Sequence, residues 1–252
     1  MPAKPGLAAE REAWVRSRPH ARVTLLRHGE PDWAPGGGPT VADPGLTPFG
    51  RAQAEAAARR LARERVDAIY ASPYRRAQET AEPLAKATGL DVVTVDDLAE
   101  IGIHFAGLSQ EEVDRIFVEA SRRPLPDHWE GWPGGETFVD FHERVTRGIT
   151  EVLAGHAIRP ERRHDFNVWH VPERAPALVV VAHGGTNAVL LTHLLDVRPV
   201  PWEWLRFESA LAAFSVAQSR PLGERGHVWS LQNFNELDHL RAAGLWIAGD
   251  EG

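Results

Sequence analysis

Short runs of apolar residues recur along the chain, and each run stops at a polar or charged residue. They lie at 23–26, 68–71, 92–95 and 177–182. Strands that are buried on both faces are apolar on consecutive positions, so these runs predict buried strands of a parallel sheet. The run at 177–182, Ala-Leu-Val-Val-Val-Ala, is the clearest of them. Two more strands are expected at 210–216 and 228–231, as the closing edge of the sheet.

Helix signals follow most of these strands. Thr47 as N-cap and Pro48 at the first helical position predict a helix that runs to about residue 64. A second helix is expected from 72–73 to about 88, with Gly89 as its stop. The stretch 109–112, Ser-Gln-Glu-Glu, has the spacing of a capping box and predicts a helix over about 110–122. Further helices are expected at 138–153, after 183–186 up to about 195, and at 7–18. Strands that alternate with helices predict an α/β fold.

The segments between the predicted strands and helices indicate the domain organisation. No repeat, low-complexity tract or linker is evident, so residues 1–252 are interpreted as one domain with residues 1–20 as an N-terminal extension. Residues 97–136 are interpreted as an insertion at the rim of a substrate site, because aromatic residues and glycines interleave from 129 to 137. A plain packing loop explains that stretch equally well. The polar segment 156–176 is long for a connection and is expected to be a mobile insertion rather than a functional flap.

The composition excludes some classes of function. The chain has 43% hydrophobic and 25% charged residues, which is ordinary for a soluble globular protein. A net charge of −7 disfavours a general binder of nucleic acid or acidic membranes, so attraction for an anion must come from a local cluster. Without cysteine there is no thiol nucleophile, disulfide or thiolate metal site. No signal peptide or bilayer-spanning run is present, so a cytoplasmic protein is expected.

Arginine and histidine side chains follow the predicted strands. Arg27 and His28 come directly after the strand at 23–26, and His183 comes directly after the strand at 177–182. Arg75 and Arg76 lie in the first turn of the helix after 68–71. The carboxyl ends of strands face the ligand crevice in open α/β sheets. Arginine can bind two oxygens of an anion and neutral histidine can attack phosphorus, so this edge suits phosphate. Taken alone, Arg27 and His28 are better interpreted as a solvated arginine and a structural histidine at a strand end, and Arg75 and Arg76 as exposed charges at a helix start.

Six strings together resemble one family. They are LLRHGE, LTPFGRAQA at 46–54, SPYRRAQETA at 72–81, PGGET at 133–137, VVVAHGG at 179–185 and NFNELDHL at 233–240. In this order they are similar to the histidine phosphatase superfamily, also called the phosphoglycerate-mutase-like family, over about residues 22–240. The resemblance implies an α/β fold, namely a three-layer α/β/α sandwich with a mostly parallel central sheet. It places the pocket at the carboxyl ends of the strands.

The resemblance also implies roles for residues. His28 would be the nucleophile that forms a phosphohistidine, and Arg27 and Arg76 would hold the phosphoryl oxygens. His183 would donate to a phosphoryl oxygen. Glu100, after the third strand, would be the general acid, although read alone it is a surface acid. No metal or cofactor is implied, because the arginines and His183 can stabilise the transferred charge.

Alternative functions remain open in the sequence. The longer signature of mutases after the first motif is absent, which favours hydrolysis of a small-molecule phosphate ester over phosphate migration. Phosphoglycerate-mutase-type phosphoryl transfer and a non-catalytic phosphate-binding or partner-docking domain are the other candidates. A metallophosphatase is conceivable with 12 histidines, but no H-E-x-x-H motif is present.

The leaving-group side of the pocket is expected to involve aromatic side chains of the rim. The candidates are Trp33, His104, Trp129 and Trp132. Stacking against a sugar or base is one interpretation, and ordinary packing is the other. The substrate and the oligomeric state are not specified by any motif.

Overall fold

The computed structural model describes Gly6 and residues 20–102, 106–132 and 134–245. These residues form an eight-stranded sheet with strand order β3-β2-β6-β1-β7-β8-β5-β4. The strands are β1 (Arg22–Arg27), β2 (Ala68–Ala71), β3 (Val92–Thr94), β4 (Arg159–Arg163), β5 (Phe166–His170), β6 (Ala177–Ala182), β7 (Phe214–Pro221) and β8 (His227–Glu236). The helices are α2 (Pro48–Leu61), α3 (Arg75–Thr88), α4 (Gln110–Ser121), α5 (Phe138–Gly155), α6 (Gly184–Leu194), α7 (Glu203–Arg206) and α8 (Asp238–Ala243).

The sheet is mixed. The neighbours β3, β2, β6 and β1 run parallel to one another. From β1 onward the pairings with β7, β8, β5 and β4 are antiparallel. The predicted α/β fold is confirmed, but the expectation of a mostly parallel sheet holds only for the half that contains β1 and β6. In the other half, the consecutive strands β4 and β5, and β7 and β8, pair as antiparallel hairpins, while the β1–β7 and β8–β5 pairings join strands far apart in the chain.

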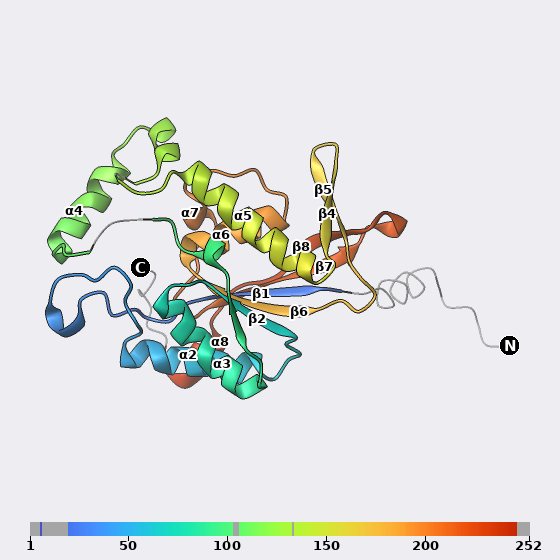
Figure 1. Ribbon diagram of the computed structural model, residues 1–252, viewed down its shortest axis with the longest axis horizontal. Helices are drawn as coiled ribbons and strands as arrows, with labels where there is room; N and C mark the ends of the chain where they lie inside the picture. The colour runs from blue at the N-terminus through green and yellow to red at the C-terminus, as the bar shows by residue number, and fades with distance from the viewer. Residues whose placement is uncertain (1–5, 7–19, 103–105, 133, 246–252) are drawn as a thin grey trace.

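Helices cover both faces of the sheet (Figure 1). Successive side chains of a strand point to opposite faces, and neighbouring residues of β1 therefore enter different cores. Leu25 packs in one cluster with Phe141 and Ile149 of α5. Leu26 packs in another cluster with Leu84 of α3 and Ala57 of α2. β1 and β6 are thus buried on both sides, as their apolar runs predicted. The prediction of a buried strand at 92–95 is wrong, because β3 lies at the edge of the sheet and Val93 is 48% exposed.

Local signals set the ends of the helices. The Thr47 hydroxyl accepts a hydrogen bond from the Gly50 amide at the start of α2. Ser109 and Glu112 form both bonds of the capping box that opens α4. Gly89 ends α3 in the left-handed conformation, at a φ of 72°. Each of these three sequence predictions is confirmed, and β2 and β6 have the bounds that were expected.

The expectation of a long polar loop at 156–176 is wrong. This segment contains the β4–β5 hairpin, which joins the sheet where Trp169 pairs with His227. β4 has the sequence Arg-Pro-Glu-Arg-Arg and lies at the edge of the sheet. Charged residues and proline are typical of an exposed edge, where they prevent pairing with another chain. Such a strand carries no apolar periodicity, so the sequence pattern resembled a loop.

Other boundaries also differ from expectation. β7 and β8 extend to Pro221 and Glu236, beyond the strands expected at 210–216 and 228–231, because polar residues pair along their ladder. A 3-10 helix, Leu125–Glu130, precedes the glycine-rich part of the loop before α5. The helix expected at 7–18 and the rim candidate His104 lie outside the described residues. Of the helices in the described ranges, none is both long enough and apolar enough to span a membrane.

Candidate active site

Three neighbouring strands deliver polar residues to one edge of the sheet. Arg27 ends β1 and is followed by His28, while Ser72 and His183 directly follow β2 and β6. The backbone ladder continues past the strand ends, because the His28 amide donates to the Ala182 carbonyl over 3.0 Å. The Ser72 amide likewise donates to the Val181 carbonyl over 3.0 Å. This continuation holds the side chains at fixed positions beside one another.

His28 is buried, with 5% of its surface exposed. Its Nδ1 lies 2.8 Å from the carbonyl oxygen of Gly29. Because a carbonyl can only accept a hydrogen bond, Nδ1 carries the proton and Nε2 keeps its lone pair. Burial, together with the charges of Arg76 and Arg27, holds the pKa of His28 well below its ordinary value. The neutral imidazole with a free Nε2 has the form that a nucleophile requires.

The backbone around His28 is held by close packing. The Gly29 amide donates to the Thr80 hydroxyl over 3.0 Å, and the Ala212 amide donates to the His28 carbonyl over 3.0 Å. A Cβ at Gly29 would lie 2.5 Å from the carbonyl oxygen of Gly50 on α2. Only glycine permits this approach of the His28 loop to the helix.

Arg76 faces the site and Arg75 faces solvent. The Arg76 side chain is 4% exposed, and its guanidinium lies over the rings of Trp33, at 5.0 Å, and Tyr74, at 4.7 Å. Within the described residues Nε and Nη1 of Arg76 have no hydrogen-bond partner, and the Asp43 carboxylate is 3.8 Å away. The Arg75 side chain is 63% exposed and pairs with Glu79. Buried N–H groups without acceptors are costly, so Arg76 favours an anion in the cavity.

Arg27 provides a second guanidinium at this edge. It donates from Nη1 to the Ser209 carbonyl. Burial lowers the pKa of both arginines, but an arginine this basic stays protonated. Two cations therefore flank the neutral imidazole of His28.

His183 is fully buried, and its ring lies edge-on to that of His28 with centroids 5.1 Å apart. Its Nε2 lies 2.7 Å from the Ser72 hydroxyl oxygen. Nδ1 has no hydrogen-bond partner among the described residues. Burial and the charge of Arg76 hold the pKa of His183 well below its ordinary value. A neutral His183 whose Nε2 accepts from Ser72 has an Nδ1–H group available to donate.

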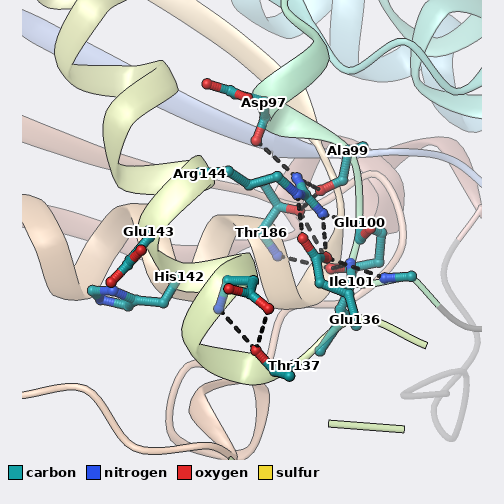
Figure 2. Close-up of polar contacts among 12 residues, drawn as sticks. Asp97, Ala99, Glu100, Ile101, Glu136, Thr137, His142, Glu143, Arg144 and Thr186 are labelled. Atoms are coloured by element: carbon teal, nitrogen blue, oxygen red, sulfur yellow. Dashed lines mark hydrogen bonds and ion pairs between the residues drawn. The ribbon is translucent and has the colours of Figure 1, made fainter. Parts of the chain in front are cut away.

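Glu100 is held at the N-terminus of α6 (Figure 2). Its carboxylate accepts hydrogen bonds from the amides of Gly185, at 2.9 Å, and Thr186, at 3.1 Å. The Ile101 amide donates to it over 3.0 Å. These three amide donors fix the position of the Glu100 carboxylate, and Glu100 lines the cavity described below.

Arg144 of α5 fastens the segment that carries Glu100 (Figure 2). It donates to the carbonyl oxygens of Asp97 and Ala99, each over 2.9 Å, and of Glu100 over 3.1 Å. On its other side it makes a two-pronged ion pair with Glu136, with both bonds at 2.7 Å. Nothing in the sequence pattern indicated this arginine, since it lies in the middle of a helix, more than forty residues from the carbonyl groups that it binds.

A cavity of about 670 Å³ is lined by Arg27, His28, Arg76 and Glu100, and Trp33 and Trp132 contribute to its walls. His183 is not among the lining residues. Trp129 is not a lining residue, and its ring packs against that of Phe138 with centroids 5.6 Å apart. The position of Trp129 in the structure thus gives no support to its expected place in the rim.

Further wall residues were not singled out from the sequence. They are Tyr74, Phe117 and Trp204. The sequence does carry a signal for Tyr74, because this residue lies beside Arg75 directly after a strand. Phe117 and Trp204 come from α4 and α7, and no local motif associates these helices with the site.

The chain is similar to proteins of a known family. A profile of the histidine phosphatase superfamily (branch 1) matches residues 23–232. Phosphoserine phosphatase 1 of Hydrogenobacter thermophilus is 35% identical over 139 residues, 54% of this chain and 65% of that protein. Glucosyl-3-phosphoglycerate phosphatase of Mycobacterium tuberculosis is 34% identical over 184 residues, 72% of this chain and 78% of that protein.

A solved structure of the mycobacterial glucosyl-3-phosphoglycerate phosphatase superposes with a TM-score of 0.65 at 28% identity. The superposition covers 86% of this chain and 99% of that one. The chain covers only part of the length of some curated relatives. It covers 47% of a bifunctional protein of Mycobacterium tuberculosis and 65% of the phosphoserine phosphatase.

Proposed function

The chain belongs to the histidine phosphatase superfamily, and on that premise we propose that it hydrolyses the phosphomonoester of a small metabolite through a phosphohistidine on His28. The observation that carries the proposal is the state of His28: a buried neutral imidazole whose Nε2 is unprotonated, which lines a cavity together with the guanidiniums of Arg27 and Arg76. The phosphatase names of the relatives support hydrolysis as the reaction.

In the first step Nε2 of His28 attacks phosphorus and the bond from phosphorus to the ester oxygen breaks. Negative charge spreads over the three remaining phosphoryl oxygens in the transition state. Arg27 and Arg76 supply positive charge there, and the Nδ1–H of His183 supplies a hydrogen bond. No step needs a metal ion, because these three residues stabilise the negative charge on the phosphoryl oxygens.

Glu100 completes the proton balance. In its protonated form it gives a proton to the departing ester oxygen. The alcohol then leaves, and the ionised Glu100 accepts a proton from the water that attacks the phosphohistidine. Inorganic phosphate and free His28 are the result, and Glu100 is again protonated for the next turnover.

The test is hydrolysis of 4-nitrophenyl phosphate in excess chelator by the wild type, His28→Ala and the control His170→Ala, whose histidine is exposed on β5. We expect turnover by the wild type and the control, and a loss of at least 1,000-fold in His28→Ala (on the scale of removing a nucleophile). Quenched wild-type enzyme is expected to contain base-stable phosphohistidine at His28 by mass spectrometry.

Two outcomes would reject the proposal. Full activity of folded His28→Ala would exclude this nucleophile. A wild type that releases no phosphate but interconverts 2- and 3-phosphoglycerate in an NMR assay would establish the mutase alternative. If neither reaction occurs and phosphate binds, the chain is a phosphate-binding domain.

A further inference from the structure

The cavity beyond the phosphate end indicates what kind of alcohol the substrate carries, an inference that rests on the proposed function. A volume of about 670 Å³ lies within the range of pockets that enclose whole drug-sized ligands. Arg27, His28 and Arg76 line this space, and the rings of Trp33 and Tyr74 lie against Arg76. Most of the lining residues are others, so their shape and polarity determine which leaving group fits the cavity.

The walls are rich in aromatic side chains. Five rings line the cavity, and they come from widely separated parts of the chain: Trp33, Tyr74, Phe117, Trp132 and Trp204. The Phe117 and Trp132 rings meet edge to face with centroids 4.9 Å apart. Aromatic pockets gain binding energy by burying apolar area and by stacking or edge contacts with another ring. A small polar alcohol would leave these surfaces in contact with water.

The α4 helix contributes one of these walls from outside the body of the sheet. Val113 and Phe117 of α4 line the cavity, although 44% of the Phe117 surface remains exposed. Figure 1 shows α4 at the far end of the molecule from the β4–β5 hairpin, apart from the sheet. An apolar residue held at such a position with nearly half of its surface in water gains most from a ligand that covers it.

The charges of the lining exclude a second anionic group on the substrate. Arg27 and Arg76 are the only lysine or arginine residues among the described residues that line the cavity. The same lining contains three carboxylates, those of Glu30, Glu100 and Glu208. If the two arginines hold the phosphate, a carboxylate elsewhere on the substrate finds no further lysine or arginine among the described lining residues and meets like charges. Such an unpaired, partly desolvated charge weakens binding strongly.

We propose that the substrate is the phosphomonoester of a ring-bearing, mainly apolar alcohol that has no anionic group besides its phosphate. The phosphate binds at Arg27 and Arg76, and the ring lies against Phe117 and Trp132. Carboxylated phosphate esters, phosphoserine among them, are then poor substrates.

The experiment compares kcat/KM for two matched pairs of aryl phosphates. The first pair, phenyl and 2-naphthyl phosphate, differs in apolar ring area. The second pair is 4-propylphenyl phosphate and its analogue whose propyl chain ends in a carboxylate, so the charge is far from the reacting oxygen. We expect at least a tenfold preference for the naphthyl ester, and at least a tenfold penalty for the carboxylate.

Variants test whether particular lining residues cause these substrate preferences. Phe117→Ala should lower the naphthyl-to-phenyl ratio towards one, whereas Val118→Ala should keep the wild-type ratio. Val118 is the matched control because it lies on the same helix, is 47% exposed and is not a lining residue. Glu208→Gln should narrow the penalty for the carboxylated analogue about twofold to threefold, as is typical of an exposed charge.

Each result decides the matter. Equal kcat/KM across both pairs, or a preference for the carboxylated ester, would overturn the inference and leave the proposed phosphatase function intact. If Phe117→Ala and Val118→Ala lower the naphthyl ratio equally, the assigned wall is wrong. If the wild type hydrolyses none of the four esters, the proposed function fails and the inference fails with it.

Discussion

Arg75 and Arg76 are neighbours in the chain, but the Arg76 side chain lies in the site and the Arg75 side chain lies at the surface. Both lie at the start of α3, where residues one position apart point about 100° away from each other. Arg75 pairs with Glu79 in solvent, while Arg76 is enclosed by the rings of Trp33 and Tyr74. The sequence placed both near the strand end, and the fold separated them.

This separation predicts opposite effects of matched substitutions. Arg76→Ala should lower kcat/KM for an aryl phosphate by about 100- to 1,000-fold, the usual effect of removing one donor to a developing oxyanion. Arg75→Ala should change it by less than about twofold, because an exposed ion pair contributes little. Steady-state kinetics with a thermal melt of each variant measure both. Equal losses in the two variants would show that Arg76 does not hold the substrate.

At the scale of elements, α5 positions Glu100 through a single side chain. Arg144 connects α5 to the segment 97–100 by three carbonyl contacts and is itself held by Glu136. One turn further along α5, Arg147 makes a two-pronged bond to the side chain of Asp97 at the surface. The two arginines provide a matched pair of contacts to the same segment, one to its backbone beside Glu100 and one to an outward carboxylate.

We predict that Arg144→Lys lowers kcat/KM about 10- to 100-fold, since lysine cannot reproduce the planar fork and a displaced catalytic group loses activity steeply. The loss should appear in kcat rather than KM. It should be larger for an alkyl phosphate than for 4-nitrophenyl phosphate, because a poor leaving group depends more on a placed acid. Arg147→Lys should stay within about twofold. Equal losses for both substrates would assign Arg144 a purely structural role.

At the scale of the whole molecule, buried histidines make stability depend on pH. His193 on α6 packs against the Trp169 ring and lies 3.1 Å from the Thr150 hydroxyl. Burial, with a smaller contribution from His142 that Asp196 opposes, lowers the pKa of His193 to about 4. The unfolded chain binds this proton at higher pH than the folded one. The stability that His193 contributes is therefore complete above pH 6.5 and is lost as the pH falls towards 4.

The expected result is a lower free energy of unfolding at pH 5 than at pH 7, with about 2 kcal/mol of the difference from His193 (pKa about 4 folded and 6.5 unfolded). Urea titrations of wild type and His193→Gln at the two pH values measure it. His193→Gln should reduce the difference by about that amount at an unchanged m-value. If His193→Gln showed the same difference in unfolding free energy between pH 5 and pH 7 as the wild type, His193 would not be the cause of the pH dependence. His28 and His183, whose pKa values are also lowered, act in the same direction.

The sequence by itself determined the strands and helices that surround the site, and the ends of the strands from which its polar residues project. Apolar runs, caps and a helix-ending glycine act within a few residues, so β1, β2, β6 and the starts of α2 and α4 could be predicted without coordinates. It also placed Arg27, His28 and His183 at strand ends, because the carboxyl ends of parallel strands meet at one edge.

Only the tertiary structure decided the antiparallel half of the sheet, the hold of Arg144 on the Glu100 segment and the walls of the cavity. Each depends on contacts between residues far apart in the chain, such as the pairing of Trp169 with His227 and the meeting of Phe117 with Trp132. Such contacts leave no period or cap in the local sequence, because a side chain's partner is set by the packing of whole elements. The charge and shape that select the leaving group therefore appear only when the chain is folded.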